Sequence, residues 1–329
     1  MTRKQITLHG LLALAVLLTL SGCGRTPSPA NSPSSVPPAQ KPASISITYV
    51  KAPLNVPSIV EKKLGSFEKE FAEDNISVTF PEITVGSKQT EAMAAGSLDI
   101  AHCLGGTSAI LAAANGVDLK IIAIYSRAPK AFVVLTKGDS IQKISDLKGK
   151  KVAGPKGTIL HQLILAALAK NGLKADDIQF VSMDLPSSVA ALMNGSVDVA
   201  LSAGPDAIRA EKAGARILTN GEGLVEATIV TAVRGEFLKK YPELVKRFLS
   251  THNSALSYMK NNSDDALNMT AAETGLPIDA VRQMYPWYDF DPAIKPSDIQ
   301  ELKRTQDFLI QNGMLQKSIE IEKMIATVK

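Results

Sequence analysis

Hydrophobic residues in this chain alternate between short continuous runs and helical spacing. The continuous runs predict buried strands at residues 46–50, 76–80, 119–125, 131–136, 180–183, 215–218 and 227–233. Apolar positions three and four residues apart predict helices at residues 56–71, 88–95 and 158–172, and a mainly helical segment from Glu236 onward. Strands and helices that alternate in this way are typical of an α/β fold, with βαβ units and parallel pairing.

One sequence element occurs twice, about a hundred residues apart. Residues 91–101 (EAMAAGSLDIA) and 191–200 (ALMNGSVDVA) both end a helix, continue through Gly-Ser, an apolar residue and Asp, and enter an apolar strand. Gly96 and Gly195 stand where the helix ends, at a position that favours a left-handed residue. Each copy continues into a glycine-containing turn and a second helix, so the repeat predicts two lobes of the same architecture.

The first residues have the pattern of an export signal. Two basic residues precede a ten-residue apolar run at 11–20, which is too short for a permanent membrane span. The run is followed by Ser-Gly-Cys at 21–23, which resembles the lipobox of bacterial lipoproteins; an ordinary signal peptide with a stray cysteine is the alternative. The resemblance implies that residues 1–22 are removed and Cys23 is lipidated. The protein would then work outside the cytoplasm, held to a membrane by its N-terminal lipid.

The rest of the chain is long enough for two lobes. Residues 23–44 are rich in Pro and Ser, so we expect an extended tether there. The 285 residues of the segment 45–329 exceed what one hydrophobic core usually holds. Without Arg3 and Lys4 of the leader, the formal net charge falls from +4 to +2, which is too small to suggest a nucleic-acid partner.

Cysteine and histidine form no recognisable catalytic or metal-binding pattern. Once Cys23 is lipidated, Cys103 is the remaining thiol, which excludes an intramolecular disulfide and suggests a small buried hydrophobic residue. His102, His161 and His252 lack the spacing of metal ligands. The sequence therefore predicts neither a metal nor a cofactor.

Several spaced segments agree with one known family. The repeat, the segment at 146–153 (DLKGKKVA), the helix start at 157–158 and the segment at 234–246 (RGEFLKKYPELVK) resemble periplasmic solute-binding proteins of ABC importers. The resemblance covers residues 45 to about 321. It points to the branch of that family that binds nitrate, taurine, aliphatic sulfonates and thiamine-pyrimidine precursors.

This resemblance implies a type II periplasmic-binding-protein fold, in which two α/β lobes clamp one ligand between them. Lobe 1 would comprise residues 45–127 and 225–329, and lobe 2 residues 128–224. Two crossover segments, near 127–130 and 221–226, would join the lobes. The resemblance also implies a monomer that delivers its solute to an ABC permease in the membrane.

Three helix starts are candidate parts of a ligand site: Gly105-Gly106-Thr107, Gly157-Thr158 and Gly204-Pro205-Asp206. Ligands of α/β proteins bind beyond the carboxyl ends of the strands, where helix N-termini offer unpaired N–H groups and a positive dipole to an anion. Thr107 and Thr158 would add hydroxyl donors. The alternative is that these residues only cap their helices.

Single residues extend this candidate site. Asn55 would donate a hydrogen bond from the loop at 51–58, Tyr125 would form a wall, and His161 lies one turn into its helix. Asp206 would meet an amine on the ligand, as in a zwitterion, or else point away as a helix cap.

Three further residues have two interpretations each. Arg127 and Lys130 lie near the first predicted crossover, where they either balance ligand charge or belong to a solvated hinge. Trp287 either covers the ligand or packs between the C-terminal helices.

These features together predict a non-catalytic receptor for a small anionic or zwitterionic solute such as a sulfonate, taurine or nitrate. An enzyme of the menaquinone-pathway or pyrimidine-forming type is the alternative on the same fold, and it would have to use His161 or Cys103. A ligand-sensing co-receptor is a third interpretation, which the sequence does not separate from transport. The receptor is favoured because no nucleophile, base and orienting residue occur at a recognisable spacing.

Overall fold

The computed structural model describes residues 41–51 and 54–328, which belong to one compact unit. The predicted signal peptide, the lipidated Cys23 and most of the predicted tether lie outside the described residues. Within the described part of the chain, no helix has both the length and the apolar character that a bilayer span requires.

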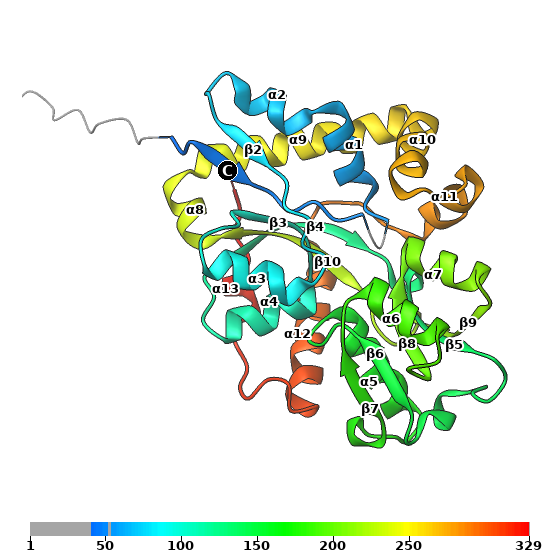
Figure 1. Cartoon of the computed structure of the whole chain (residues 1–329). Helices are drawn as coiled ribbons and strands as arrows, with labels where there is room; N and C mark the ends of the chain where they lie inside the picture. The colour runs from blue at the N-terminus through cyan, green and yellow to red at the C-terminus, as the bar shows by residue number, and fades with distance from the viewer. Residues whose placement is uncertain (1–40, 52–53, 329) are drawn as a thin grey trace, which may run out of the picture. The chain divides into compact units, whose positions relative to one another are not determined.

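Three sheets form the framework of the unit (Figure 1). A parallel pair consists of β1 (Ser44–Ser46) and β2 (Ser77–Thr79). The three-stranded sheet has the order β3 (Ile100–Gly105), β10 (Thr228–Arg234), β4 (Leu119–Arg127). The five-stranded sheet has the order β7 (Gln179–Ser182), β6 (Lys151–Gly154), β8 (Val199–Ala203), β5 (Phe132–Lys137), β9 (Ala215–Asn220).

The prediction of an α/β fold is confirmed, whereas the predicted parallel pairing holds for only some of the strands. β6 runs parallel to β7 and β8, as expected for βαβ units. β5 is antiparallel to β8 and β9, and β10 is antiparallel to both β3 and β4. β10 enters the three-stranded sheet after the chain has left the five-stranded one, and it runs against both of its neighbours. The direction of each strand therefore depends on how the chain crosses between the sheets.

Helices cover these sheets and connect their strands. The α-helices are α1 (Val56–Leu64), α2 (Ser66–Ala72), α3 (Gly86–Ala94), α4 (Gly106–Ala114), α5 (Ile159–Lys170), α6 (Leu185–Met193), α7 (Gly204–Lys212), α8 (Gly235–Lys240), α9 (Pro242–Asn261), α10 (Ser263–Thr274), α11 (Ile278–Met284), α12 (Pro296–Gln311) and α13 (Ile321–Met324). Short 3-10 turns are η1 (Pro129–Ala131), η2 (Ile144–Leu147), η3 (Ala175–Asp177) and η4 (Tyr285–Trp287).

Glycines end several of these helices as the sequence predicts. Gly96 and Gly195, which stand just after the helix in each copy of the repeat, have φ of 73° and 80°. The single helix predicted at 56–71 is wrong, because Gly65 adopts φ 61° and separates α1 from α2. The apolar spacing continues through this break, so periodicity alone does not reveal it.

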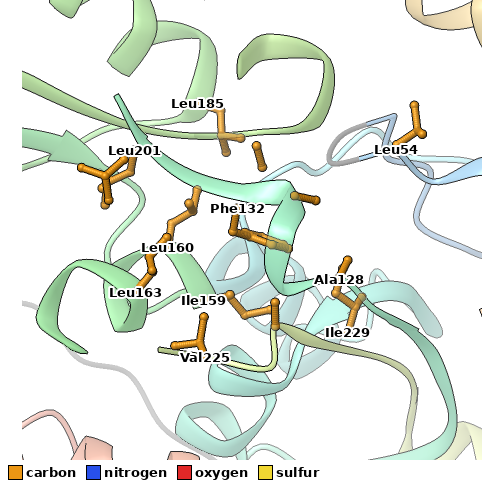
Figure 2. Close-up of a cluster of buried hydrophobic side chains, with 14 of the residues drawn as sticks. Leu54, Ala128, Phe132, Ile159, Leu160, Leu163, Leu185, Leu201, Val225 and Ile229 are labelled. Atoms are coloured by element: carbon orange, nitrogen blue, oxygen red, sulfur yellow. The ribbon is translucent and has the colours of Figure 1, made fainter. Parts of the chain in front are cut away.

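One hydrophobic cluster extends from the five-stranded sheet to the three-stranded one. It includes Phe132 of β5, Ile159 of α5, Leu201 of β8 and Ile229 of β10. Figure 2 shows Phe132 and Ile159 close to Ile229, at the place where the two sheets approach each other. The core is therefore continuous across both sheets.

Two connections link the sheets, and they contact each other. β4 leads through η1 into β5, and β9 returns through residues 221–227 to β10. The backbone N–H of Gly221 donates to the carbonyls of Pro129 and Phe132, both at 3.1 Å. A Cβ atom at Gly221 would lie 2.5 Å from the Pro129 carbonyl oxygen, so this close approach requires glycine.

The charge of Arg127 is balanced by carboxylates beside this hinge. Its Nε and Nη2 donate to the two carboxylate oxygens of Asp298 at 2.7 and 2.6 Å, and Nη1 donates to Asp289 at 2.9 Å. Nearby, the Lys130 ammonium lies 5.5 Å from the centre of the Trp287 ring. The structure therefore favours the hinge interpretation of both basic residues and the packing interpretation of Trp287.

Candidate ligand-binding pocket

A pocket opens at the carboxyl ends of strands from both sheets, and it encloses about 730 Å³ of space that includes open solvent. Gly105 ends β3, Ala203 ends β8 and Pro155 follows β6, and all three line the pocket. Side chains with polar atoms come from Thr84, Gln89, Cys103, Ser108, Thr158 and Asp206. Apolar walls come from Val50, Phe132, Ile159, Leu160, Leu185 and Ile229, among others. The position agrees with the general location of ligand sites in α/β proteins.

Four helix N-termini meet at this pocket. Gly86 begins α3, while Gly105, Thr158 and Ala203 immediately precede α4, α5 and α7. None of these four helices has a side-chain cap. Their first-turn N–H groups and dipoles, each equivalent to roughly half a positive charge, are therefore available to an anion. None of the described residues that line the pocket is Lys or Arg, so the backbone supplies the positive potential.

Three of the predicted site residues line the pocket: Gly105, Thr158 and Asp206. The predicted glycines 106, 157 and 204 are each next to a lining residue in the chain. At Gly106, a Cβ atom would lie 2.9 Å from Leu302 and 3.1 Å from the Thr228 carbonyl oxygen. This glycine therefore serves close packing of α4 against α12 and β10.

The two predicted hydroxyl donors are used within the protein. Thr107 Oγ1 donates to Gln162 Oε1 at 2.6 Å, and Thr158 Oγ1 donates to the Pro155 carbonyl at 2.7 Å. Thr107 is buried and does not line the pocket. Ser108, which sequence reasoning missed although it is the next residue, lines the pocket and donates to the Gly157 carbonyl at 2.9 Å.

Asn55, Tyr125 and His161 lie away from the pocket lining. Asn55 is buried, and its Nδ2 donates to the carbonyl of Val50 at 2.8 Å. Because Val50 lines the pocket, Asn55 positions the wall without forming it. The Tyr125 hydroxyl lies 2.9 Å from Ser58 Oγ in the interior.

His161 is held as a neutral side chain. Its Nδ1 accepts from the backbone N–H of Gly157 at 3.3 Å, and its ring centre lies 4.4 Å from that of Phe180. Burial, together with Lys156, lowers the pKa of His161 to about 4. The ring therefore supports the loop before α5 and carries no charge at neutral pH.

Cys103 lies in the pocket wall but does not have the properties of a nucleophile. Its Sγ lies 3.4 Å from Ser58 Oγ, and burial raises the pKa of the thiol to about 12. A thiol with so high a pKa carries almost no thiolate at neutral pH. This argues against the catalytic use of Cys103 that an enzyme on this fold would need.

A buried charge cluster lies behind the pocket and was not predicted. Nε2 of His102 and Nδ1 of His252 donate to the two carboxylate oxygens of Glu61 at 2.9 and 2.6 Å, and all three side chains are buried. Burial alone would raise the pKa of Glu61, but the two imidazoles lower it overall. The cluster joins α1, β3 and α9. No local pattern reveals it, because Glu61 is separated from its partners by 41 and 191 residues.

Among the described residues, one group has the side chains that could hold a metal ion: Glu61, His102 and His252. Their candidate ligand atoms all lie within 4.8 Å of one another. Ligand atoms around a tetrahedral zinc ion, bound at 2.0–2.2 Å, would stand about 3.3 Å apart. The distances of 2.6 and 2.9 Å are shorter, so the arrangement is that of a hydrogen-bonded network.

Two sheets that share one pocket, with helix N-termini turned toward it, are the architecture of a periplasmic solute-binding protein. The chain belongs to the NMT1/THI5-like family, whose profile matches residues 56–266. A Bacillus subtilis (strain 168) protein assigned as an aliphatic sulfonates-binding protein is 30% identical over 321 residues, covering 96% of this chain and 94% of that protein. An Escherichia coli (strain K12) protein with the same assignment is 29% identical over 292 residues, covering 86% of this chain and 89% of that protein.

A solved structure supports the same assignment. The alkanesulfonate-binding protein from Xanthomonas axonopodis pv. citri, bound to MOPS, matches with a TM-score of 0.80 and 25% identity. The match covers 88% of this chain and all of that one. The predicted family and the predicted type of fold are thereby confirmed.

Proposed function

We propose that this protein is an extracytoplasmic receptor that binds a small organic sulfonate and delivers it to an ABC permease. The observation that carries the proposal is the meeting of four helix N-termini, none with a side-chain cap, at one pocket with apolar walls. A sulfonate is a permanent anion with three acceptor oxygens, which suits backbone N–H donors, and its carbon chain suits the apolar walls. The names of the relatives point to the same class of ligand.

Capture would proceed by closure of two lobes around the ligand. Lobe 1 comprises residues 45–127 and 225–329, and lobe 2 comprises 128–224, with the two sheet connections as the hinge. The hydrogen bonds from Ser108 to Gly157 and from Thr107 to Gln162 join α4 to the segment around α5, so they would form as the lobes close. Closure removes the ligand from water and strengthens its contact with the helix dipoles.

The receptor would act as a monomer tied to the membrane through a lipid on Cys23. The chain after Cys23 would hold the folded unit away from the bilayer and leave it free to meet the permease. An enzymatic role is less well supported, because the Cys103 thiol and the His161 ring are both neutral at physiological pH and His161 lies off the pocket.

A substitution at Thr158 tests the anion site. Aspartate is a favourable N-cap residue, so Thr158→Asp should leave α5 folded while it places a negative charge at the pocket and occupies first-turn N–H groups. We expect calorimetric titration with hexanesulfonate to show binding by the wild type. Thr158→Asp should bind at least about tenfold more weakly.

Thr158→Asn is the matched control, because it has nearly the same shape and caps the helix without a charge. It should keep most of the affinity. The proposal fails if no organic sulfonate binds the folded wild type, or if Thr158→Asp binds hexanesulfonate as tightly as Thr158→Asn does.

A further inference from the structure

Arg209 connects the two lobes proposed above, close to the pocket. It lies in α7, three residues after Asp206, which lines the pocket. Its Nη2 donates to Asp206 Oδ1 at 2.6 Å, and its Nη1 donates to the carbonyl of Thr274 at 3.0 Å. Asp206 belongs to lobe 2, whereas Thr274 is the last residue of α10 in lobe 1. One guanidinium therefore joins a pocket residue of one lobe to the backbone of the other.

The end of α10 is a favourable place for a cation from outside this helix. Carbonyl groups at a helix C-terminus carry the negative end of the helix dipole and lack partners within the helix. The last turn of α10, which lies within the described residues, has no basic side chain of its own. Its Glu273 pairs with Lys63 and Lys51 of the same lobe, at 2.5 and 3.3 Å. The Thr274 carbonyl is left as an acceptor for Arg209 of the other lobe.

Asp206 fixes the direction of the Arg209 side chain. An arginine side chain has many rotamers and loses conformational entropy when it is held in one of them. The Arg209 side chain is 52% exposed, while that of Asp206 is 17% exposed and does not cap α7. An ion pair between residues three apart on one helix favours the rotamers that bring the two groups together. Asp206 is therefore a positioning residue for Arg209.

This contact is separate from the other hydrogen bonds between the lobes. Those bonds join α4 to the segment around α5, through Ser108 and Thr107. The Arg209 contact joins α7 to α10, and in Figure 1 α7 lies beneath α10 and α11. The lobes are therefore bridged at two places, and the second bridge begins one turn from the pocket lining.

We propose that Arg209 is a latch, positioned by Asp206, that holds the closed lobes together and retains the bound ligand. The hydrogen bond to Thr274 is made only when the lobes are closed. It therefore stabilises the closed state and slows release of the ligand. This inference rests on the proposed sulfonate-binding function and adds two positioning residues to the capture of the ligand.

Calorimetric titration of the full chain with hexanesulfonate tests the latch. Arg209→Gln removes the charge, while Arg209→Lys keeps the charge but replaces two donor nitrogens by a single ammonium. We expect both variants to bind about fivefold more weakly than the wild type, a modest loss because the side chain is half exposed. Lys212→Gln is the matched control, because it removes an exposed cation from the same helix. Its affinity should stay within about 1.5-fold of the wild-type affinity.

A double-mutant cycle tests the role of Asp206. In an Asp206→Asn background, Arg209→Gln should weaken binding by less than it does in the wild-type background, because Arg209 is no longer held toward Thr274. An undiminished effect would overturn the positioning role of Asp206.

Thermal melts without ligand separate a latch from a contact that stabilises the fold. The lobes are then free to open, so Arg209→Gln should melt within about 1 °C of the wild type. A clearly lower melting temperature would overturn the latch, because Arg209 would then stabilise the fold itself. Wild-type affinity in Arg209→Lys would also overturn it, because charge alone would explain Arg209.

Both of these results would leave the proposed sulfonate function standing, since the wild type would still bind hexanesulfonate. If no organic sulfonate binds the folded wild type, both proposals are overturned.

Discussion

Replacing Glu61 by Gln tests whether the buried carboxylate organises the structure behind the pocket. The carboxylate accepts one hydrogen bond from each of two imidazoles, while Gln offers one acceptor oxygen and turns an N–H donor toward the other ring. The cluster is surrounded by aromatic rings: Phe67 and Phe248 lie 6.1 and 5.0 Å from His102 between ring centres. Water therefore has little access to repair the lost hydrogen bond.

The expected cost follows from these contacts. A hydrogen bond to a charged group contributes about 1.5–3 kcal/mol, and removing one partner of a buried charged cluster costs about 3–5 kcal/mol. Relief of the buried negative charge offsets part of this, so we expect Glu61→Gln to lower the free energy of unfolding by about 3 kcal/mol. For a folded unit of this size, whose entropy of unfolding is about 2.1 cal/mol/K per residue, that corresponds to a melting temperature lower by roughly 5 °C.

Urea denaturation followed by circular dichroism measures this change, with Glu68→Gln as the control. Glu68 lies on α2 and is exposed, so its replacement should change the free energy of unfolding by less than about 0.5 kcal/mol. A loss below about 1 kcal/mol in Glu61→Gln would refute the reasoning, because the cluster would then contribute no more than an ordinary surface pair.

The same cluster predicts the pH dependence of stability. The pKa of Glu61 is lowered in the folded state from its ordinary value of 4.5. Burial lowers the pKa of His102 from 6.5. In both cases the unfolded chain binds more protons, so stability is complete above pH 6.5 and falls as the pH decreases. Wild-type denaturation midpoints should therefore decline from pH 7 to pH 4. Glu61 opposes the effect of burial on the pKa of His102, so the midpoints of Glu61→Gln should decline at least as steeply over this range, and a shallower decline would contradict the reasoning.

Two further substitutions test the hinge and the pocket boundary. Gly221→Ala should lower the free energy of unfolding by about 1–3 kcal/mol, because its Cβ would lie 2.5 Å from the Pro129 carbonyl oxygen. A thermal melt measures this change, and an unchanged melting temperature would contradict the close approach. The hexanesulfonate affinity of His161→Leu should stay within about twofold of the wild-type affinity, because the ring is neutral and does not line the pocket. Titration calorimetry measures this affinity, and a tenfold loss would show that His161 contributes to the binding site.

Features that depend only on residues close together in the sequence could be predicted from the sequence. Glycine ends the helices of both repeats at Gly96 and Gly195, because only a residue without a Cβ adopts a left-handed conformation at little cost. The glycine-containing helix starts were recognised for the same local reason, and Gly105, Thr158 and Asp206 do line one pocket. Family resemblance also rests on such local motifs, and the comparisons confirm it.

The tertiary structure decided which of the candidate groups line the pocket. The hydroxyl of Thr107 is used by Gln162, a residue 55 positions away on another helix, so its type and position in the motif did not determine its role. Gln89 and Ser108 reach the pocket instead. Whether a polar side chain is available to a ligand depends on every competing partner within hydrogen-bond distance, and those partners come from distant parts of the chain.

Strand direction and the buried charge cluster both depend on contacts between distant segments of the chain. β10 lies antiparallel between β3 and β4 because the chain crosses to the other sheet and returns before it forms this strand. Glu61 meets His252 across 191 residues because α1 and α9 pack on each other. Local sequence determines the elements and their ends, whereas contacts between distant segments follow from packing of the whole chain, which buries apolar surface and leaves few buried polar groups unpaired.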